Sequence, residues 1–87
     1  FFARAGLPMD PVQILETVEL RKIHEIKAAE LACTRATDDN YEALRAILQR
    51  SEERLAAGET IHTEDKDFHL EIVRATKNSV FYRVCSL

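Results

Sequence analysis

Residues 10–35, DPVQILETVELRKIHEIKAAELACTR, contain no glycine, and their only proline is Pro11. Asp10 is a good N-cap, and Pro11 suits the first helical position because the N–H it lacks would be unpaired there. Gln13 stands where the second member of a capping box belongs. The stretch therefore predicts one long helix. Its apolar residues occur on more than one side of the helix, which predicts a central helix contacted on more than one face.

A second helix is predicted to follow directly. Thr37 can cap it, and Asp38 and Asp39 would lie in its first turn, where acids favour the positive end of the helix dipole. Its apolar residues recur at spacings of three and four: Tyr41, Leu44, Ile47, Leu48 and Leu55. Gly58 can adopt the left-handed conformation that ends a helix, so this amphipathic helix is expected to stop there.

Two more helices are expected in the remaining sequence. The third runs from about Glu59 or Thr63 to Thr76, and Asn78 is the expected N-cap of a fourth, which begins at Ser79. No stretch alternates apolar and polar residues over the length of a strand. The sequence therefore predicts an all-α fold, an antiparallel helical bundle.

Composition excludes several classes of function. With 87 residues the chain is one domain at most, and its net charge of −3 argues against a nucleic-acid-binding surface. Two cysteines are too few for a disulfide framework, and together with the lack of a signal sequence or a long apolar run they predict a cytoplasmic protein that contacts no membrane. No phosphate loop, HExxH motif or activated nucleophile is present, so we expect a protein that is not an enzyme.

An acid and an imidazole lie one turn apart in the predicted third helix. Asp65 falls within a stripe that Ile61, Phe68 and Ile72 predict to be buried, and His69 lies close to it. Burying a carboxylate without compensation is costly, so the pair is expected either to bind a divalent metal or to hydrogen-bond each other, and spacing alone favours the hydrogen bond. His62, seven residues before His69, is a weaker candidate for a third ligand.

Arg21 is a candidate for binding an acid. It lies between Leu20 and Ile23 on the helix predicted to be central, and an arginine held inside a bundle can clamp a carboxylate through two parallel hydrogen bonds. The alternative is an ion pair within the helix with Glu25, four residues on, and composition alone favours this pair.

Several segments, in order, resemble one protein family. The segment 65–69, DKDFH, followed by Ala75 and Asn78, resembles the D-x-x-F-H…A…N signature of the C-terminal sensing domain, the FCD domain, of FadR-type GntR transcription regulators. Upstream, Glu19, Arg21 and Glu25 resemble that family's E-x-R-x-x-x-E segment. The likeness continues through Ala28, Ala29, Leu31, Ala32 and Thr37-Asp38, and its order and spacing hold over about residues 10–87.

The resemblance implies an architecture. It implies a bundle of six or seven helices, of which residues 10–87 would supply the first four or so as a truncated effector-binding domain. Residues 1–9 would be the linker from a missing N-terminal winged-helix domain, which alone would contact DNA. The family resemblance further implies a homodimer.

The resemblance also implies a ligand site. The effector would be a small carboxylate, with Arg21 facing its pocket. A divalent metal, zinc or nickel, would be held by Asp65 and His69 together with two later histidines beyond Leu87, so the metal site would be incomplete here. His24 departs from the aliphatic residue usual in the family.

Two functions follow from this reading. The first is the effector-sensing and dimerisation domain of a DNA-binding transcription regulator. The alternative is a helical protein-interaction module without a small-molecule site. Since the later helices would be missing, apolar faces on the first and third helices are expected to be exposed.

Overall fold

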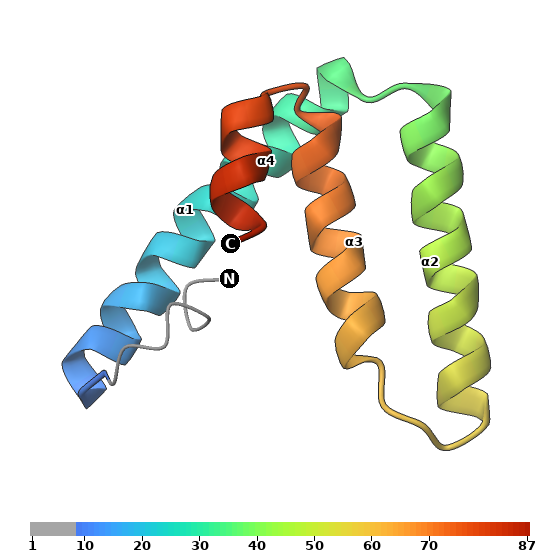
Figure 1. The fold of residues 1–87 in the computed structure, drawn as a ribbon, viewed down its shortest axis with the longest axis horizontal. Coiled ribbons are helices and arrows are strands. Elements are labelled where there is room, and N and C mark those ends of the chain that lie inside the picture. The colour runs from blue at the N-terminus through green and yellow to red at the C-terminus, as the bar shows by residue number, and fades with distance from the viewer. Residues whose placement is uncertain (1–8) are drawn as a thin grey trace.

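The computed structural model describes residues 9–87 and contains no strand within them. Four helices follow one another: α1 (Pro11–Arg35), α2 (Asp38–Ala56), α3 (His62–Ala75) and α4 (Ser79–Cys85) (Figure 1). The predicted all-α fold is therefore confirmed. The predicted linker, residues 1–9, lies outside the described residues except for Met9.

Local capping fixes most helix ends where the sequence predicts them. Asp10 and Gln13 form the capping box of α1, with the Gln13 amide donating to Asp10 Oδ1 at 2.8 Å. Asn78 caps α4 by accepting from the Phe81 amide at 3.0 Å. Gly58 has a φ of +76°, the left-handed conformation expected at the end of α2.

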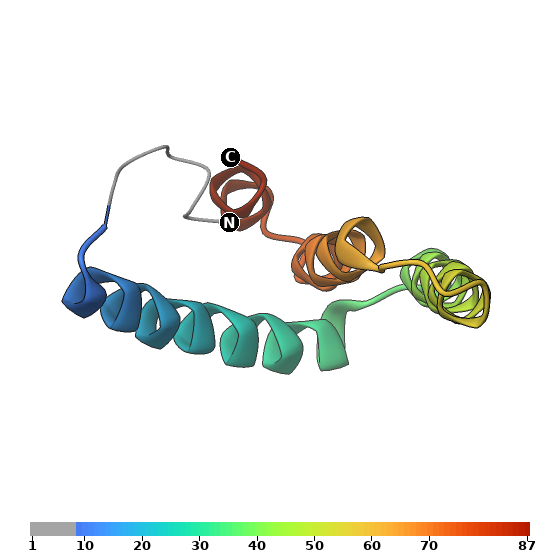
Figure 2. The same ribbon diagram turned by 90° about the horizontal axis from the view of Figure 1, so that it is seen from below.

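The helices form an open layer around α3. In Figure 1, α2 and α3 lie side by side and antiparallel, while α1 crosses at an angle and α4 folds back beside α3. Of the four helices, α3 contacts each of the others. Figure 2 shows this arrangement from below, and the shortest extent of the molecule is only 18 Å.

The core lies where α1, α3 and α4 meet. Its buried members are Ala28, Val73 and Cys85, one from each helix. The partly buried side chains packed against them are Leu70, Ile72, Phe81 and Tyr82. Only the C-terminal half of α1 takes part, because Ala28 is the buried residue of that helix.

The prediction that α1 is central and contacted on more than one face is wrong for the described residues. Large apolar side chains of α1 are exposed: Val12, Ile14, Leu15, Val18, Leu20, Ile23 and Ile26. The expected exposed apolar face of α1 is therefore confirmed. On α3 that expectation is wrong, because Phe68, Leu70 and Ile72 are partly buried, and Leu70 and Ile72 pack against the core.

A buried acid supports the connection between α2 and α3. Glu64 is 6% exposed, and its Oε1 lies 3.0 Å from Arg54 Nε. That N–H donates to the Thr60 carbonyl oxygen at 3.0 Å, so Glu64 Oε1 has a nearby cation but no hydrogen-bond partner among residues 9–87. Arg54 also pairs with Glu59 at 3.0 Å and thus binds both the loop and the first turn of α3. Within the same part of the chain, no helix is long and apolar enough to cross a membrane.

Candidate functional site

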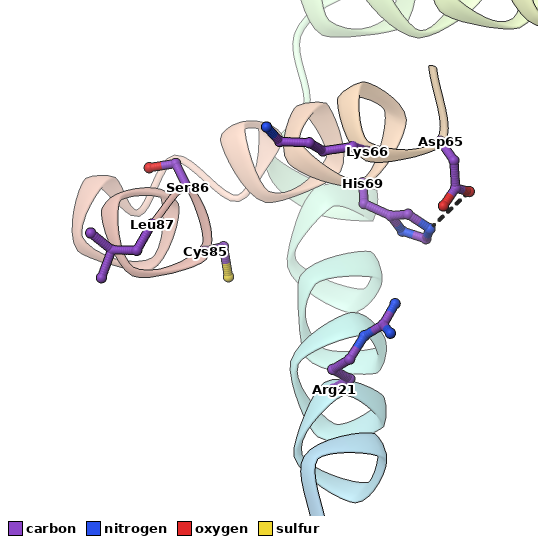
Figure 3. A pocket seen from close by; sticks show the side chains of 7 residues that line it. All are labelled: Arg21, Asp65, Lys66, His69, Cys85, Ser86 and Leu87. Carbon is purple, nitrogen blue, oxygen red and sulfur yellow. Dashed lines mark ion pairs between the residues drawn. The ribbon is translucent and has the colours of Figure 1, made fainter. Parts of the chain in front are cut away.

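A cavity of about 110 Å³ opens between α1, α3 and the end of α4. We call it the α1–α3–α4 cavity, and the residues that line it are Arg21, Asp65, Lys66, His69, Cys85, Ser86 and Leu87 (Figure 3). Its wall therefore includes three of the four candidate residues from the sequence, Arg21 from α1 and Asp65 and His69 from α3. The packing of α3 across α1 brings these distant positions together.

Asp65 and His69 face each other in the cavity. His69 Nε2 lies 3.4 Å from Asp65 Oδ1, longer than a well-formed N–H···O hydrogen bond. The Asp65 side chain is 65% exposed, so the prediction that it lies in a buried stripe is wrong. The buried acid is its neighbour Glu64. Because α3 is packed on two sides, Glu64 faces the packed interior while Asp65, in the same first turn, faces the open cavity.

Arg21 makes only a loose pair within its own helix. Its NH2 atom lies 3.6 Å from Glu25 Oε1, and both side chains are substantially exposed. Such exposed i, i+4 pairs contribute about 0.3–0.5 kcal/mol, so little holds the guanidinium in this contact. In Figure 3 the guanidinium points toward His69 and Asp65. The predicted pair with Glu25 is confirmed, and it leaves Arg21 able to reach a ligand.

The donor atoms of Asp65 and His69 suit one edge of a metal site. Two ligands bonded to zinc at 2.0–2.2 Å in a tetrahedron are separated by roughly 3.3–3.6 Å, and the observed 3.4 Å falls in that range. Residues 9–87 contain no group of three or more histidine, cysteine, aspartate or glutamate side chains placed to hold an ion. His62 is exposed and does not line the cavity. These two residues thus fit half of a metal site.

A smaller pocket of about 30 Å³ continues the cavity toward the core. It shares His69 and Cys85 with the cavity and adds His24 from α1. His24 Nδ1 lies 3.9 Å from Cys85 Sγ, and the imidazole meets the Phe81 ring edge to face with centroids 5.5 Å apart. His24 therefore packs against α4, which accounts for a ring at a position where the family resemblance implies an aliphatic residue.

Some lining residues were not predicted from the sequence. Lys66 adjoins Asp65 inside the DKDFH segment. Its positive charge next to Asp65 was the sequence feature that could have indicated a place in the cavity wall. Cys85, Ser86 and Leu87 reach the cavity only because α4 folds back beside α3, and no local pattern indicates that return.

Comparison with known proteins gives one family and two curated relatives. The FCD domain family matches residues 16–87. The chain is 33% identical over 69 residues to the Uxu operon regulator of Haemophilus influenzae, covering 79% of this chain and 26% of the regulator. It is 35% identical over 80 residues to the Nta operon transcriptional regulator of Aminobacter aminovorans, covering 90% of this chain and 36% of that protein. The chain thus spans about a quarter to a third of the length of these relatives. No solved structure matches it.

Proposed function

Because this chain belongs to the FCD domain family, we propose that it is the effector-sensing domain of a transcription regulator and binds a small organic acid in the α1–α3–α4 cavity. The observation that supports this most is that Arg21, Asp65 and His69 line one cavity from two helices. Both relatives are named as operon regulators, which supports a regulatory role rather than a catalytic one.

The proposed acid is held by its carboxylate. Arg21 can donate two parallel hydrogen bonds to a carboxylate, and its weak pair with Glu25 is readily exchanged for this stronger one. Asp65 and His69 would hold a divalent metal, zinc or nickel, which when bound supplies positive charge for the same carboxylate. The remaining metal ligands would come from solvent or from sequence outside residues 9–87.

Binding of the acid would restrain α1 against α3. The N-terminal half of α1 has no buried residue, so few contacts fix its angle to the rest of the domain. An acid held by Arg21 on α1 and, through the metal, by His69 and Asp65 on α3 would link the two helices at this point. In the proposed regulator, α1 follows a DNA-binding winged-helix domain in a homodimer, so this link favours one arrangement of the dimer and changes DNA affinity.

The first test is metal binding by the full-length regulator. Metal content and titrations with zinc and nickel are compared for the wild type, Asp65→Ala and His69→Ala. We expect one bound ion in the wild type and a loss of at least about tenfold in affinity in both variants. Asp67→Ala is the matched control, because Asp67 belongs to the same helix but pairs with Arg50 at 3.0 Å outside the cavity.

The outcomes separate the parts of the proposal. If the wild type binds no metal, the metal role of Asp65 and His69 is wrong, and the acid site depends on Arg21. If the full-length protein binds its operator equally well with and without the acid, the sensing role is wrong.

A second candidate function is a helical protein-interaction module. The exposed apolar side chains of α1 favour it, since large exposed apolar patches commonly mark interfaces. A module of this kind would bind its partner equally well after Arg21→Ala, Asp65→Ala or His69→Ala. A sensor would lose acid binding in these variants.

A further inference from the structure

We propose that Lys66 makes the α1–α3–α4 cavity selective for an acid with two acidic groups. This inference rests on the proposed function, because it specifies the class of acid that the sensor binds. It starts from a difference between Lys66 and the other charged residues of the cavity wall. Arg21 has Glu25 as a partner, and Asp65 has His69. Within residues 9–87, Lys66 makes no ion pair or hydrogen bond, although its side chain is partly buried.

Two cationic side chains line the cavity, and in the described part of the chain only Arg21 has an acidic partner, in its ion pair with Glu25. Arg21 and Lys66 provide two fixed positive charges. The nearby carboxylates are Glu25, which pairs with Arg21, and Asp65, which faces His69. The remaining lining groups are the His69 imidazole, the Cys85 thiol, the Ser86 hydroxyl and the Leu87 side chain. One carboxylate on Arg21 leaves the Lys66 ammonium group unneutralised.

The two cations approach the cavity from different walls. Figure 3 shows the Arg21 guanidinium turned toward His69 and Asp65, while the Lys66 side chain extends along α3 toward the α4 side. A single carboxylate bound between Arg21 and His69 lies on one side of this space. A second acidic group on the same molecule can turn toward Lys66 and gain a charge-assisted hydrogen bond.

The cavity has room for a compact acid. An apolar cavity of about 150 Å³ accommodates benzene. The observed volume of about 110 Å³, formed within residues 9–87 and open on one side, is large enough for a short diacid. We infer a short dicarboxylate, with or without a hydroxyl group.

The test compares malonate with monomethyl malonate, which has nearly the same shape but one acidic group fewer. Both are titrated calorimetrically into the full-length protein at one fixed ionic strength. The variants are Lys66→Gln, Lys66→Arg and, as a control, Lys22→Gln on an exposed part of α1 away from the cavity. Circular dichroism checks that every variant keeps its helical content.

We expect the wild type to bind malonate at least about tenfold more tightly than the monoester, which corresponds to one charge-assisted hydrogen bond. Lys66→Gln should lose about tenfold for malonate and less than twofold for the monoester. Lys66→Arg should retain the preference, and Lys22→Gln should change neither affinity.

Three results would overturn the inference in distinguishable ways. If both acids bind and Lys66→Gln weakens them equally or not at all, Lys66 does not select diacids, while the acid-sensing function stands. If neither acid binds the wild type but longer monocarboxylates do, the cavity is a sensor site of a different class. If no acid of any kind binds, the proposed function fails together with this inference.

Discussion

The two cysteines of the chain have opposite surroundings. Cys33 is exposed on α1, whereas Cys85 is buried against Ala28 and Val73. Burial raises the pKa of the Cys85 thiol above its ordinary value of 9.0, because the thiolate would lose its hydration. The free energy that favours folding with a neutral thiol is therefore present below pH 9 and is lost as the pH rises through the raised pKa.

We predict that iodoacetamide at pH 8 alkylates Cys33 at least about tenfold faster than Cys85, because the thiolate is the reactive form and Cys85 is both buried and protonated. Mass spectrometry of Cys33→Ser and Cys85→Ser follows each thiol separately. In denaturant the two rates should become similar. Equal rates in the native protein would show that α4 does not hold Cys85 in the core.

Glu64 and Asp65 show why the predicted burial of Asp65 was wrong. Successive side chains on a helix point about 100° apart, so Glu64 faces Arg54 while Asp65 faces the cavity. The stripe of Phe68 and Ile72 predicts burial of a single side, but α3 is packed against α2 on one side and against α1 and α4 on the other. When a helix is packed on two sides, the spacing of its apolar residues does not show which of its other positions are buried.

At the scale of the elements, Asn40 joins the start of α2 to the end of α3. It is 4% exposed, and its Oδ1 accepts from the Thr37 amide at 2.9 Å and from Lys77 Nζ at 2.6 Å. Its Nδ2 donates to Glu71 Oε2 at 2.8 Å. The side chain therefore satisfies groups from three segments in a position closed to water, where an unpaired polar group would be costly.

We predict that Asn40→Ala lowers the free energy of unfolding by about 2–3 kcal/mol, because it removes the Asn40 half of the capping box of α2 and leaves Glu71 and Lys77 without their buried partner. Chemical denaturation followed by circular dichroism measures the change. Gln49→Ala, which removes an exposed side-chain contact on the same helix, should cost less than about 0.5 kcal/mol. A similar small loss for Asn40→Ala would mean that this junction does not stabilise the fold.

Helix ends were predictable where their causes are local. The capping pairs of α1 and α4 and the left-handed Gly58 depend on residues three or fewer positions away. The start of α3 at His62 lies between the predicted starts at Glu59 and Thr63, because Ile61 in the cap position makes no side-chain capping bond. Asn40 was not predicted as a junction, since its partners Glu71 and Lys77 are distant in sequence.

At the scale of the whole molecule, the angle between α1 and the α2–α3 pair decides what is exposed. The sequence predicts a long helix correctly, but the position of that helix depends on which of its faces meets α3. Ala28 fills this role because its small side chain is buried where the helices meet. The same crossing places Arg21, Asp65 and His69 around one cavity, and these are the three residues that the resemblance to the FCD family implies as ligand-site candidates.

The exposed face of α1 provides the last prediction. Leu15 and Ile26 are 70% and 61% exposed, on the side of α1 opposite the buried Ala28. In the 87-residue chain, the double variant Leu15→Gln, Ile26→Gln should change the free energy of unfolding by less than about 0.5 kcal/mol, because neither side chain leaves a core. It should also reduce binding of a hydrophobic dye and concentration-dependent association, since it removes apolar surface.

Val73→Gln is the matched control for this variant. Val73 is 5% exposed, so placing an amide there should cost about 2–4 kcal/mol through lost packing and a buried polar group. Thermal unfolding, dye fluorescence and sedimentation velocity are measured on both variants. If the double variant Leu15→Gln, Ile26→Gln lost about 2 kcal/mol or more of its free energy of unfolding, this face of α1 would be packed in solution. The N-terminal half of α1 would then contribute to the core as well.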